Sequence, residues 1–76
     1  MKELIEVMAK ALVDAPEEVT VTENKGENTS VFELSVARGD VGKVIGKKGR
    51  TAESMRILLA AASTKLRRRS VLEIVD

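Results

Sequence analysis

The chain has 76 residues, 43% of them hydrophobic, and a net charge of +1, so we expect a single domain over residues 1–76 with a thin core. The sequence contains no cysteine and no histidine, which excludes disulfides, cysteine-type zinc sites and the commonest general base, and we expect no enzyme, metal or cofactor. The acidic start lacks a secretory signal core, and no apolar run approaches the length of a membrane span, so we expect a cytoplasmic protein without a membrane partner.

The first half of the chain predicts a helix followed by a β-hairpin. Apolar residues recur at helical spacing over residues 2–14, and Pro16 ends this helix because proline disfavours the helical conformation of the residue before it. Residues 19–23 and 31–36 alternate in polarity and are rich in β-branched residues, while residues 24–28 have the composition of a turn. The residues of the second strand that should point inward are Phe32, Leu34 and Val36.

The second half predicts two helices and a final strand. Asp40 is placed to cap a short helix over residues 41–45, since an aspartate side chain can accept a hydrogen bond from a first-turn amide. A longer helix is expected from about Arg50 to Leu66, and residues 71–75 read as a strand. The inward stripe of the long helix should be Ala52, Met55, Leu59, Ala62 and Leu66.

The order α-β-β-α-α-β favours an α+β fold in which three helices cover one face of a three-stranded sheet. The first two strands should pair antiparallel through the hairpin. The third strand returns only after two helices, so it should run parallel to the second strand and make the sheet mixed.

Charge is divided unevenly along the chain. Residues 1–40 carry four basic and nine acidic residues, a net of −5, whereas residues 41–76 carry nine basic and three acidic residues, a net of +6. This segregation suggests a surface for an anionic partner. Four of the basic residues gather where the long helix ends and either complement the helix dipole or contact such a partner, namely Lys65, Arg67, Arg68 and Arg69.

The loop between the two later helices has the sequence Gly46-Lys47-Lys48-Gly49. A nucleotide-binding P-loop needs a G-x-x-x-x-G-K-[ST] frame, but the spacing from Gly42 to Gly46 is one residue too short and Lys48 stands where Ser or Thr should. A G-x-x-G loop that clamps single-stranded nucleic acid fits better, since glycine permits close approach of backbones and lysine neutralises phosphates.

The stretch Val44-Ile45-Gly46-Lys47-Lys48-Gly49 resembles the apolar-Ile-Gly-x-x-Gly signature of KH domains, and the element order resembles the type II KH arrangement. Across its whole length the chain is similar to the stand-alone bacterial KhpA family. The resemblance implies single-stranded RNA binding, with single-stranded DNA left open, by a small RNA-chaperone protein in post-transcriptional regulation linked to cell-envelope growth and cell shape. It also implies a homodimer, or a heterodimer with a larger KH-containing protein of the Jag type.

The predicted RNA-binding surface is centred on the loop. Its lysines and arginines supply charge, and the N-terminus of the helix starting near Arg50 offers unpaired N–H groups to a phosphate. Val44 and Ile45, with Val36, should form an apolar floor under the bases. The full predicted set is Lys43, Val44, Ile45, Gly46, Lys47, Lys48, Gly49, Arg50 and Arg56. With a single Phe and no Trp or Tyr, the chain lacks the stacking platform of other RNA-binding folds.

A second interpretation is a partner-assembly module in which RNA contact is secondary. Ile57 lies off the inward stripe of the long helix, where it either forms an intermolecular face or packs against the first helix. The acidic pair Glu17-Glu18 reads as a solvated strand entry rather than a catalytic site.

Overall fold

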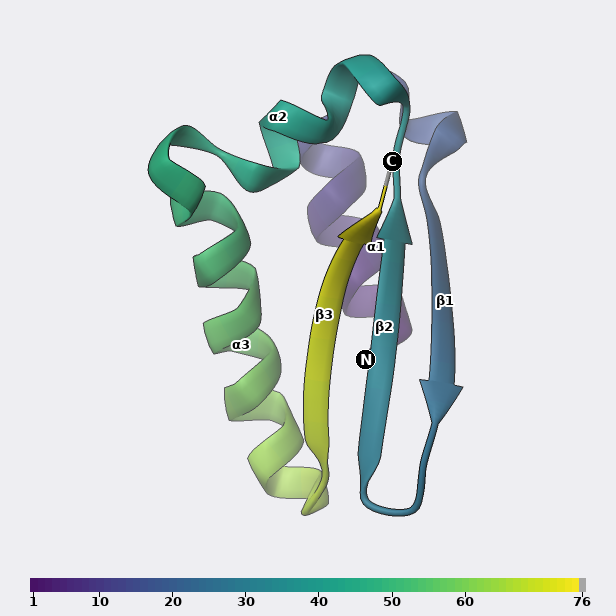
Figure 1. The fold of residues 1–76 in the computed structure, drawn as a ribbon, viewed down its shortest axis with the longest axis vertical. Coiled ribbons are helices and arrows are strands. Elements are labelled where there is room, and N and C mark those ends of the chain that lie inside the picture. Colours follow the sequence, from purple (N-terminus) through teal and green to yellow (C-terminus); the bar gives the residue numbers. More distant parts are fainter. Residues whose placement is uncertain (76) are drawn as a thin grey trace.

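A computed structural model describes residues 1–75 of the chain. The expected element order and α+β class are confirmed (Figure 1). None of the helices in this described range is long and apolar enough to cross a membrane. The elements are α1 (Lys2–Leu12), β1 (Thr20–Lys25), β2 (Thr29–Ser35), α2 (Val41–Ile45), α3 (Arg50–Leu66) and β3 (Arg69–Val75), with short 3-10 turns at Pro16–Glu18, Arg38–Asp40 and Lys47–Gly49.

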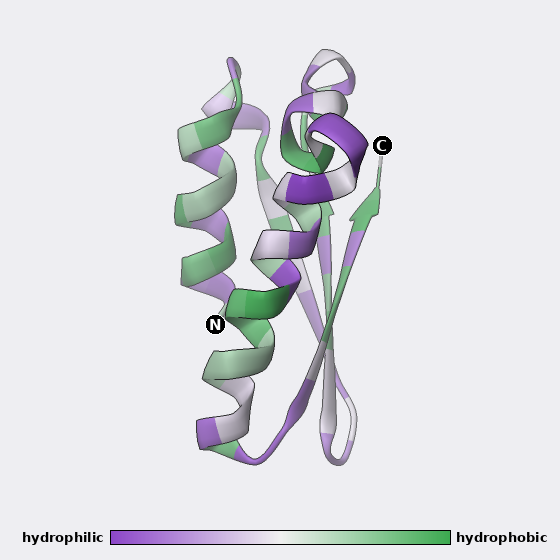
Figure 2. Ribbon diagram, turned by 90° about the vertical axis from the view of Figure 1, so that its left-hand side faces the viewer, coloured by the Kyte–Doolittle hydropathy of each residue, from purple (hydrophilic) through white to green (hydrophobic). Residues whose placement is uncertain are grey.

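The three strands form one mixed sheet in the order β1-β2-β3. β1 and β2 pair antiparallel, with Glu23 opposite Phe32, and β2 and β3 pair parallel, with Phe32 opposite Leu72. The parallel pairing follows from the long connection through α2 and α3, which brings the chain back to the starting end of β2. All three helices lie on the same side of the sheet (Figure 2).

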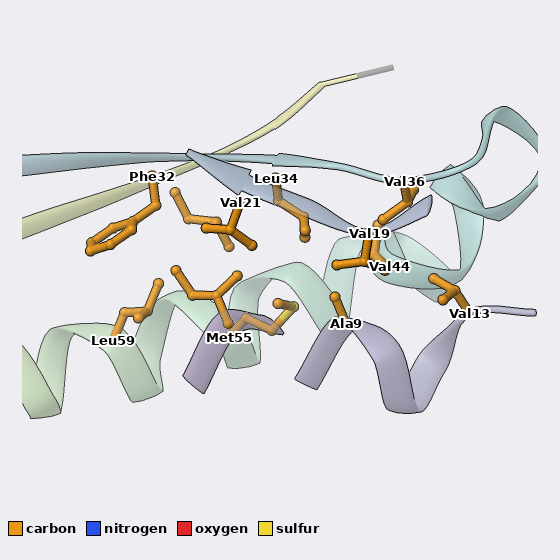
Figure 3. Packing of buried hydrophobic residues seen from close by; sticks show 12 residues of the cluster. Ala9, Val13, Val19, Val21, Phe32, Leu34, Val36, Val44, Met55 and Leu59 are labelled. Atoms are coloured by element: carbon orange, nitrogen blue, oxygen red, sulfur yellow. The ribbon is translucent and has the colours of Figure 1, made fainter. Parts of the chain in front are cut away.

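The core lies between that face of the sheet and helices α1 and α3 (Figure 3). Phe32 points from β2 toward Leu59 of α3, and Leu34 points from β2 into the space between the sheet and the helices. All three are at most 1% exposed. The inward orientation expected for Phe32, Leu34 and Val36 is confirmed, as is a core role for Met55. Every second side chain of β2 is buried. No element of the described chain covers the other face of the sheet.

Helix α1 ends two residues earlier than its apolar periodicity predicts. The backbone of Val13 is already extended, although its N–H still donates to the carbonyl of Ala9. Val13 nonetheless belongs to the core cluster. Its burial accounts for the apparent extension of the helical pattern, because an extended residue can point inward as well as a helical one.

The inward stripe expected for α3 is wrong at its C-terminal end. Leu66 is 58% exposed, and Ser63 is buried in its place. Ser63 Oγ donates to the Leu59 carbonyl at 2.7 Å and is hydrogen-bonded to Ser70 Oγ of β3. The buried row therefore continues from Leu59 to Ser63, four residues later, on the side that faces β3. The hydroxyl groups of Ser63 and Ser70 are hydrogen-bonded to each other where an apolar residue was expected.

Asp40 precedes α2 as expected, but it does not cap that helix with its side chain. Its carboxylate is 4% exposed, and Oδ2 accepts a hydrogen bond of 3.1 Å from the backbone N–H of Ala15. The residue therefore ties the segment after α1 to the start of α2. Sequence alone could not show this, because the donor lies 25 positions away.

Candidate nucleic-acid interface

The glycine-lysine loop forms one tight turn between α2 and α3, at the end of the molecule away from the β-hairpin turn (Figure 1). The N–H of Gly46 donates to the carbonyl of Gly42 at 2.9 Å, and the N–H of Gly49 donates to that of Gly46 at 3.1 Å. Both glycines have positive φ, at 79° and 73°. The turn is thus a defined structure built on conformations that suit glycine.

The surroundings of the two glycines of the loop differ. A Cβ added at Gly46 would lie 2.6 Å from the Cβ of Thr51, so the protein itself fills that space. A Cβ added at Gly49 would meet nothing within 4 Å, so the space beside this residue is open. Close approach of an external backbone is therefore available at Gly49, whereas Gly46 is required by packing inside the loop.

Three of the predicted cations gather on this turn. The side chains of Lys47, Lys48 and Arg50 are exposed, and no carboxylate of residues 1–75 lies within ion-pair distance of them. Lys48 itself has a positive φ of 57°, a conformation that costs a side-chain-bearing residue about 1–2 kcal/mol. The loop thus presents concentrated positive charge that nothing in the described chain neutralises.

The N-terminus of α3 adds backbone donors to the same place. No side chain caps this 17-residue helix, whose N-cap is Gly49. The N–H of Arg50 already donates to the carbonyl of Lys47, but no side chain caps the N–H groups that follow it, and these and the positive end of the dipole can face an anion. They lie next to the loop lysines because the turn leads directly into the helix.

The apolar floor expected beneath the bases is wrong in two of its three residues. Val44 is 0% exposed and Val36 is 6% exposed, and both belong to the core. Ile45 is 39% exposed and is the member of the trio that a ligand can reach. Successive residues of an α-helix are rotated by about 100°, so Val44 packs in the core while its neighbour Ile45 faces outward.

The two flanking cations are held by contacts within the protein. Lys43 Nζ lies 3.2 Å from Asp14 Oδ2, in a pair whose side chains are 46% and 81% exposed. Arg56 Nη2 donates to the carbonyl of Leu72 at 3.2 Å, which joins α3 to β3. Lys43 is therefore partly neutralised, whereas Arg56 keeps its charge and is fixed beside the edge strand.

The second basic cluster lies at the opposite end of α3. The guanidinium of Arg68 donates to the carbonyls of Gly26, Glu27 and Thr29 and to Ser30 Oγ, at 3.1–3.2 Å. It thereby binds the β1–β2 turn to the start of β3. The sequence predicted Arg68 to be either a cation of the helix end or an RNA contact, and it could not show this role because the turn that Arg68 holds is about 40 positions away.

Comparison with known proteins gives the family. The chain matches the family "KhpA/KhpB, KH domain" over residues 2–74. It belongs to this family. The KhpA/KhpB family is not an enzyme family, and no group of acidic residues in the described part of this chain could hold a metal ion.

Relatives in this family match the chain over nearly its whole length. It is 51% identical to "RNA-binding protein KhpA" of Clostridium acetobutylicum, covering 99% of this chain and 100% of the relative. It is 52% identical to the protein of that name from Treponema pallidum, and the match covers 99% of this chain and 94% of the relative. The one from Halalkalibacterium halodurans is 50% identical, with 100% of both chains covered.

A solved structure shares the fold. The crystal structure of Aquifex aeolicus Era bound to GDP and aluminium fluoride superposes with a TM-score of 0.60 and 25% identity. The match covers 96% of this chain but 28% of Era. The likeness therefore concerns one part of that larger protein, and it supports the fold of this chain.

Proposed function

We propose that this protein binds single-stranded RNA through the turn from Gly46 to Gly49. The observation that carries the proposal is the uncompensated charge of Lys47 and Lys48 beside an uncapped helix N-terminus. Relatives about 50% identical over their full lengths are named RNA-binding proteins, and KH domains clamp about four nucleotides with a G-x-x-G loop.

The loop acts on the phosphodiester backbone. A phosphate enters the open space beside Gly49, where N–H groups of the first turn of α3 beyond Arg50 donate to it. Lys47 and Lys48 neutralise the neighbouring phosphates, so affinity falls with salt by a log–log slope of about 0.7 per phosphate. Ile45 supplies the apolar contact for a base. Arg56 lies farther along α3, where it is hydrogen-bonded to β3.

The test is a charge reversal at the loop. The double variant Lys47→Asp/Lys48→Asp should lose at least tenfold in affinity for a uridine dodecanucleotide and keep its fold, because both side chains are exposed. The matched control is Lys2→Asp/Lys10→Asp, which changes the net charge equally on exposed positions of α1. A folded loop variant with unchanged affinity, or an equal loss in the control, would refute the clamp.

We place this binding in the cytoplasm, in RNA-chaperone activity and post-transcriptional regulation linked to cell-envelope growth. The similarity to the KhpA family supports this role. Crosslinking to cellular RNA followed by sequencing, with the loop double variant as control, tests it. Transcripts that depend on the loop and encode envelope functions would support the role, and recovery of the same transcripts by the variant would contradict it.

A second candidate function is partner assembly, with a second copy or with a larger KH-containing protein of the Jag type. Helices α1 and α3 expose large apolar side chains to solvent, and such residues favour an interface when they adjoin one another. The most exposed are Val7 (67%), Ile57 (61%), Leu66 (58%) and Leu58 (52%).

Sedimentation of the wild type and of Ile57→Glu separates the two functions. A dimer that Ile57→Glu dissociates would support assembly through α3. Ser54→Glu is the matched control, since it adds the same charge at an exposed polar position of the same helix. A wild type that is monomeric at all concentrations would exclude self-assembly.

A further inference from the structure

The sheet extends beyond α1 toward the β1–β2 turn, so α3 alone covers the helix-facing side of the sheet there. Figures 1 and 2 show the N-terminal end of α1 near the middle of the sheet. The register places Lys25, Ser30 and Ser70 side by side across this end of the sheet, on the same side as Phe32 and Leu72 two positions farther along. The last helix-facing row of the sheet is therefore polar, whereas the next row contributes Phe32 and Leu72 to the core.

A hollow of about 270 Å³ adjoins this polar row. Its wall combines Lys25, Ser30 and Ser70 with Arg68 and with two residues of the helical layer, Met1 and Leu66. Because Met1 directly precedes α1 and Leu66 ends α3, the hollow lies between the sheet and the ends of two helices. We call it the polar hollow.

The hydroxyl proton of Ser30 has no acceptor among residues 1–75. Ser30 is 3% exposed, and its Oγ accepts a hydrogen bond of 3.2 Å from Arg68 Nη2. A serine hydroxyl has one proton to donate. Ser63 donates its proton to the Leu59 carbonyl, so Ser70 donates its own to Ser63. Ser30 thus keeps an unused donor beside the hollow, and burial of such a donor without an acceptor is unfavourable.

Positive charge at the polar hollow is not neutralised within the described chain. No carboxylate of residues 1–75 lies within ion-pair distance of Lys25 or Arg68. The guanidinium of Arg68 donates to neutral carbonyls and to Ser30, so it keeps its charge. Glu23 is the one acidic residue of the wall. With two cationic side chains against one carboxylate, the hollow has the charge and the donors that suit an oxyanion.

An apolar groove continues from the polar hollow between α1 and α3. It measures about 490 Å³, and Met1 and Leu66 line both spaces. Leu66 is 58% exposed and Leu4 is 39% exposed, so apolar surface of both helices is in contact with water here. An aliphatic chain in the groove would remove that surface from water. The remaining lining residues are Leu4, Ala61, Ala62 and Lys65.

We infer that the protein binds an amphiphilic anion, whose carboxylate or phosphate head lies in the polar hollow and whose short aliphatic chain lies in the apolar groove. Lys25 and Ser30 donate to the head, Arg68 adds its charge, and Leu66 covers the start of the chain. The two spaces together reach the size of small-molecule sites, roughly 300–1,000 Å³. The site lies at the opposite end of α3 from the loop, so it is separate from the proposed RNA clamp.

The test titrates isotope-labelled protein with straight-chain carboxylates and follows the amide chemical shifts. Affinity should rise about twofold to fourfold for each methylene added between butanoate and octanoate, as burial of the chain requires. Octanoate should shift the amides of Ser30, Ser70 and Leu66 and leave that of Gly49 in place. Octanol has the same chain without the charge, and it should bind at least tenfold more weakly.

Two pairs of variants separate the head from the chain. Lys25→Gln and Ser30→Ala should each weaken octanoate about threefold to tenfold and leave octanol unchanged, because each removes a contact to the head. Lys10→Gln, which removes a cation from an exposed position of α1, is their control. Ala61→Leu should fill the groove and abolish the dependence on chain length. Ala60→Leu makes the same change at a neighbouring residue outside the groove and is the matched control.

Absence of octanoate shifts around the polar hollow would overturn the inference. Equal affinity for acetate and octanoate would remove the groove from it, and equal affinity for octanol would remove the head-group site. A loss that Lys10→Gln reproduces would mean that general charge explains the binding. Displacement of octanoate by a uridine dodecanucleotide would assign the hollow to RNA instead. None of these results affects the clamp, which the loop double variant tests separately.

Discussion

Thr51 fills the space that a side chain at Gly46 would need. A Cβ at Gly46 would lie 2.6 Å from the Thr51 Cβ and 2.9 Å from its backbone nitrogen, both too close for real atoms. The other glycine of the loop, Gly49, has open space in the same test. One glycine therefore serves the internal packing of the turn, and the other leaves a surface free.

This difference predicts opposite effects of two alanine substitutions. Gly46→Ala should destabilise the domain by about 3 kcal/mol, since its positive φ with an extended ψ suits only glycine and the added methyl clashes with Thr51. Gly49→Ala should cost about 1 kcal/mol, yet weaken RNA binding in the folded protein. Urea unfolding and RNA titration of both variants check this, and equal losses of stability would contradict it.

Lys48 provides a way to separate charge from stability. Its positive φ is tolerated better by asparagine than by lysine, so Lys48→Asn should leave the melting temperature unchanged or raise it slightly while RNA affinity falls. Lys47→Asn removes the same charge from a position without positive φ, and it should show no gain in stability. If Lys48→Asn lowers both stability and affinity, the lysine side chain has a structural role that the exposed loop does not show.

Arg68 should matter for stability far more than its neighbours in the basic cluster. Arg68→Ala removes the donors that hold the β1–β2 turn and should cost about 1–3 kcal/mol. Arg68→Lys should restore little, because a lysine cannot reproduce a planar fork of donors. Urea unfolding measures the loss, hydrogen exchange should show it first at residues 25–30, and Arg69→Ala as control should leave stability unchanged.

The Lys43–Asp14 pair predicts a gain in binding. Asp14 Oδ2 lies 3.2 Å from Lys43 Nζ at an exposed site, so the pair contributes less than about 1 kcal/mol to stability. Asp14→Asn frees the lysine for a phosphate and should raise RNA affinity about twofold at low salt, an effect that disappears at high salt. Glu17→Gln, at an exposed position outside the pair, is the control, and an equal gain there would mean that only net charge matters.

Element order, strand pairing and the position of the loop were predictable because they depend on local signals. Alternation around Phe32 and Leu34 identified a strand with one buried face, and the spacing of Ala52, Met55 and Leu59 identified a helix. The long connection before β3 implied parallel pairing. The strand and helix patterns lie within short stretches of sequence, where propensity and periodicity act directly, and the strand pairing follows from the order of the elements.

Predictions failed where the sequence pattern could not show which of several side chains is buried, because packing in the tertiary structure decides this. Leu66 matched the apolar spacing of α3, yet Ser63 is buried because Ser70 of β3 satisfies its hydroxyl. Val44 carried the apolar character expected of a binding floor, yet it lies in the core. In both cases packing against another element decided which side chain turned inward, and the apolar pattern of the element itself did not.

The sequence by itself determined the α+β order, the KH-like loop and the basic character of the second half of the chain. Only the tertiary structure decided which of those charges are free, because the acceptors that occupy Arg68 and Arg56 are carbonyls of other strands. Backbone acceptors leave no trace in composition. Packing also distinguishes the two glycines. Thr51 occupies the space beside Gly46, whereas the space beside Gly49 is open.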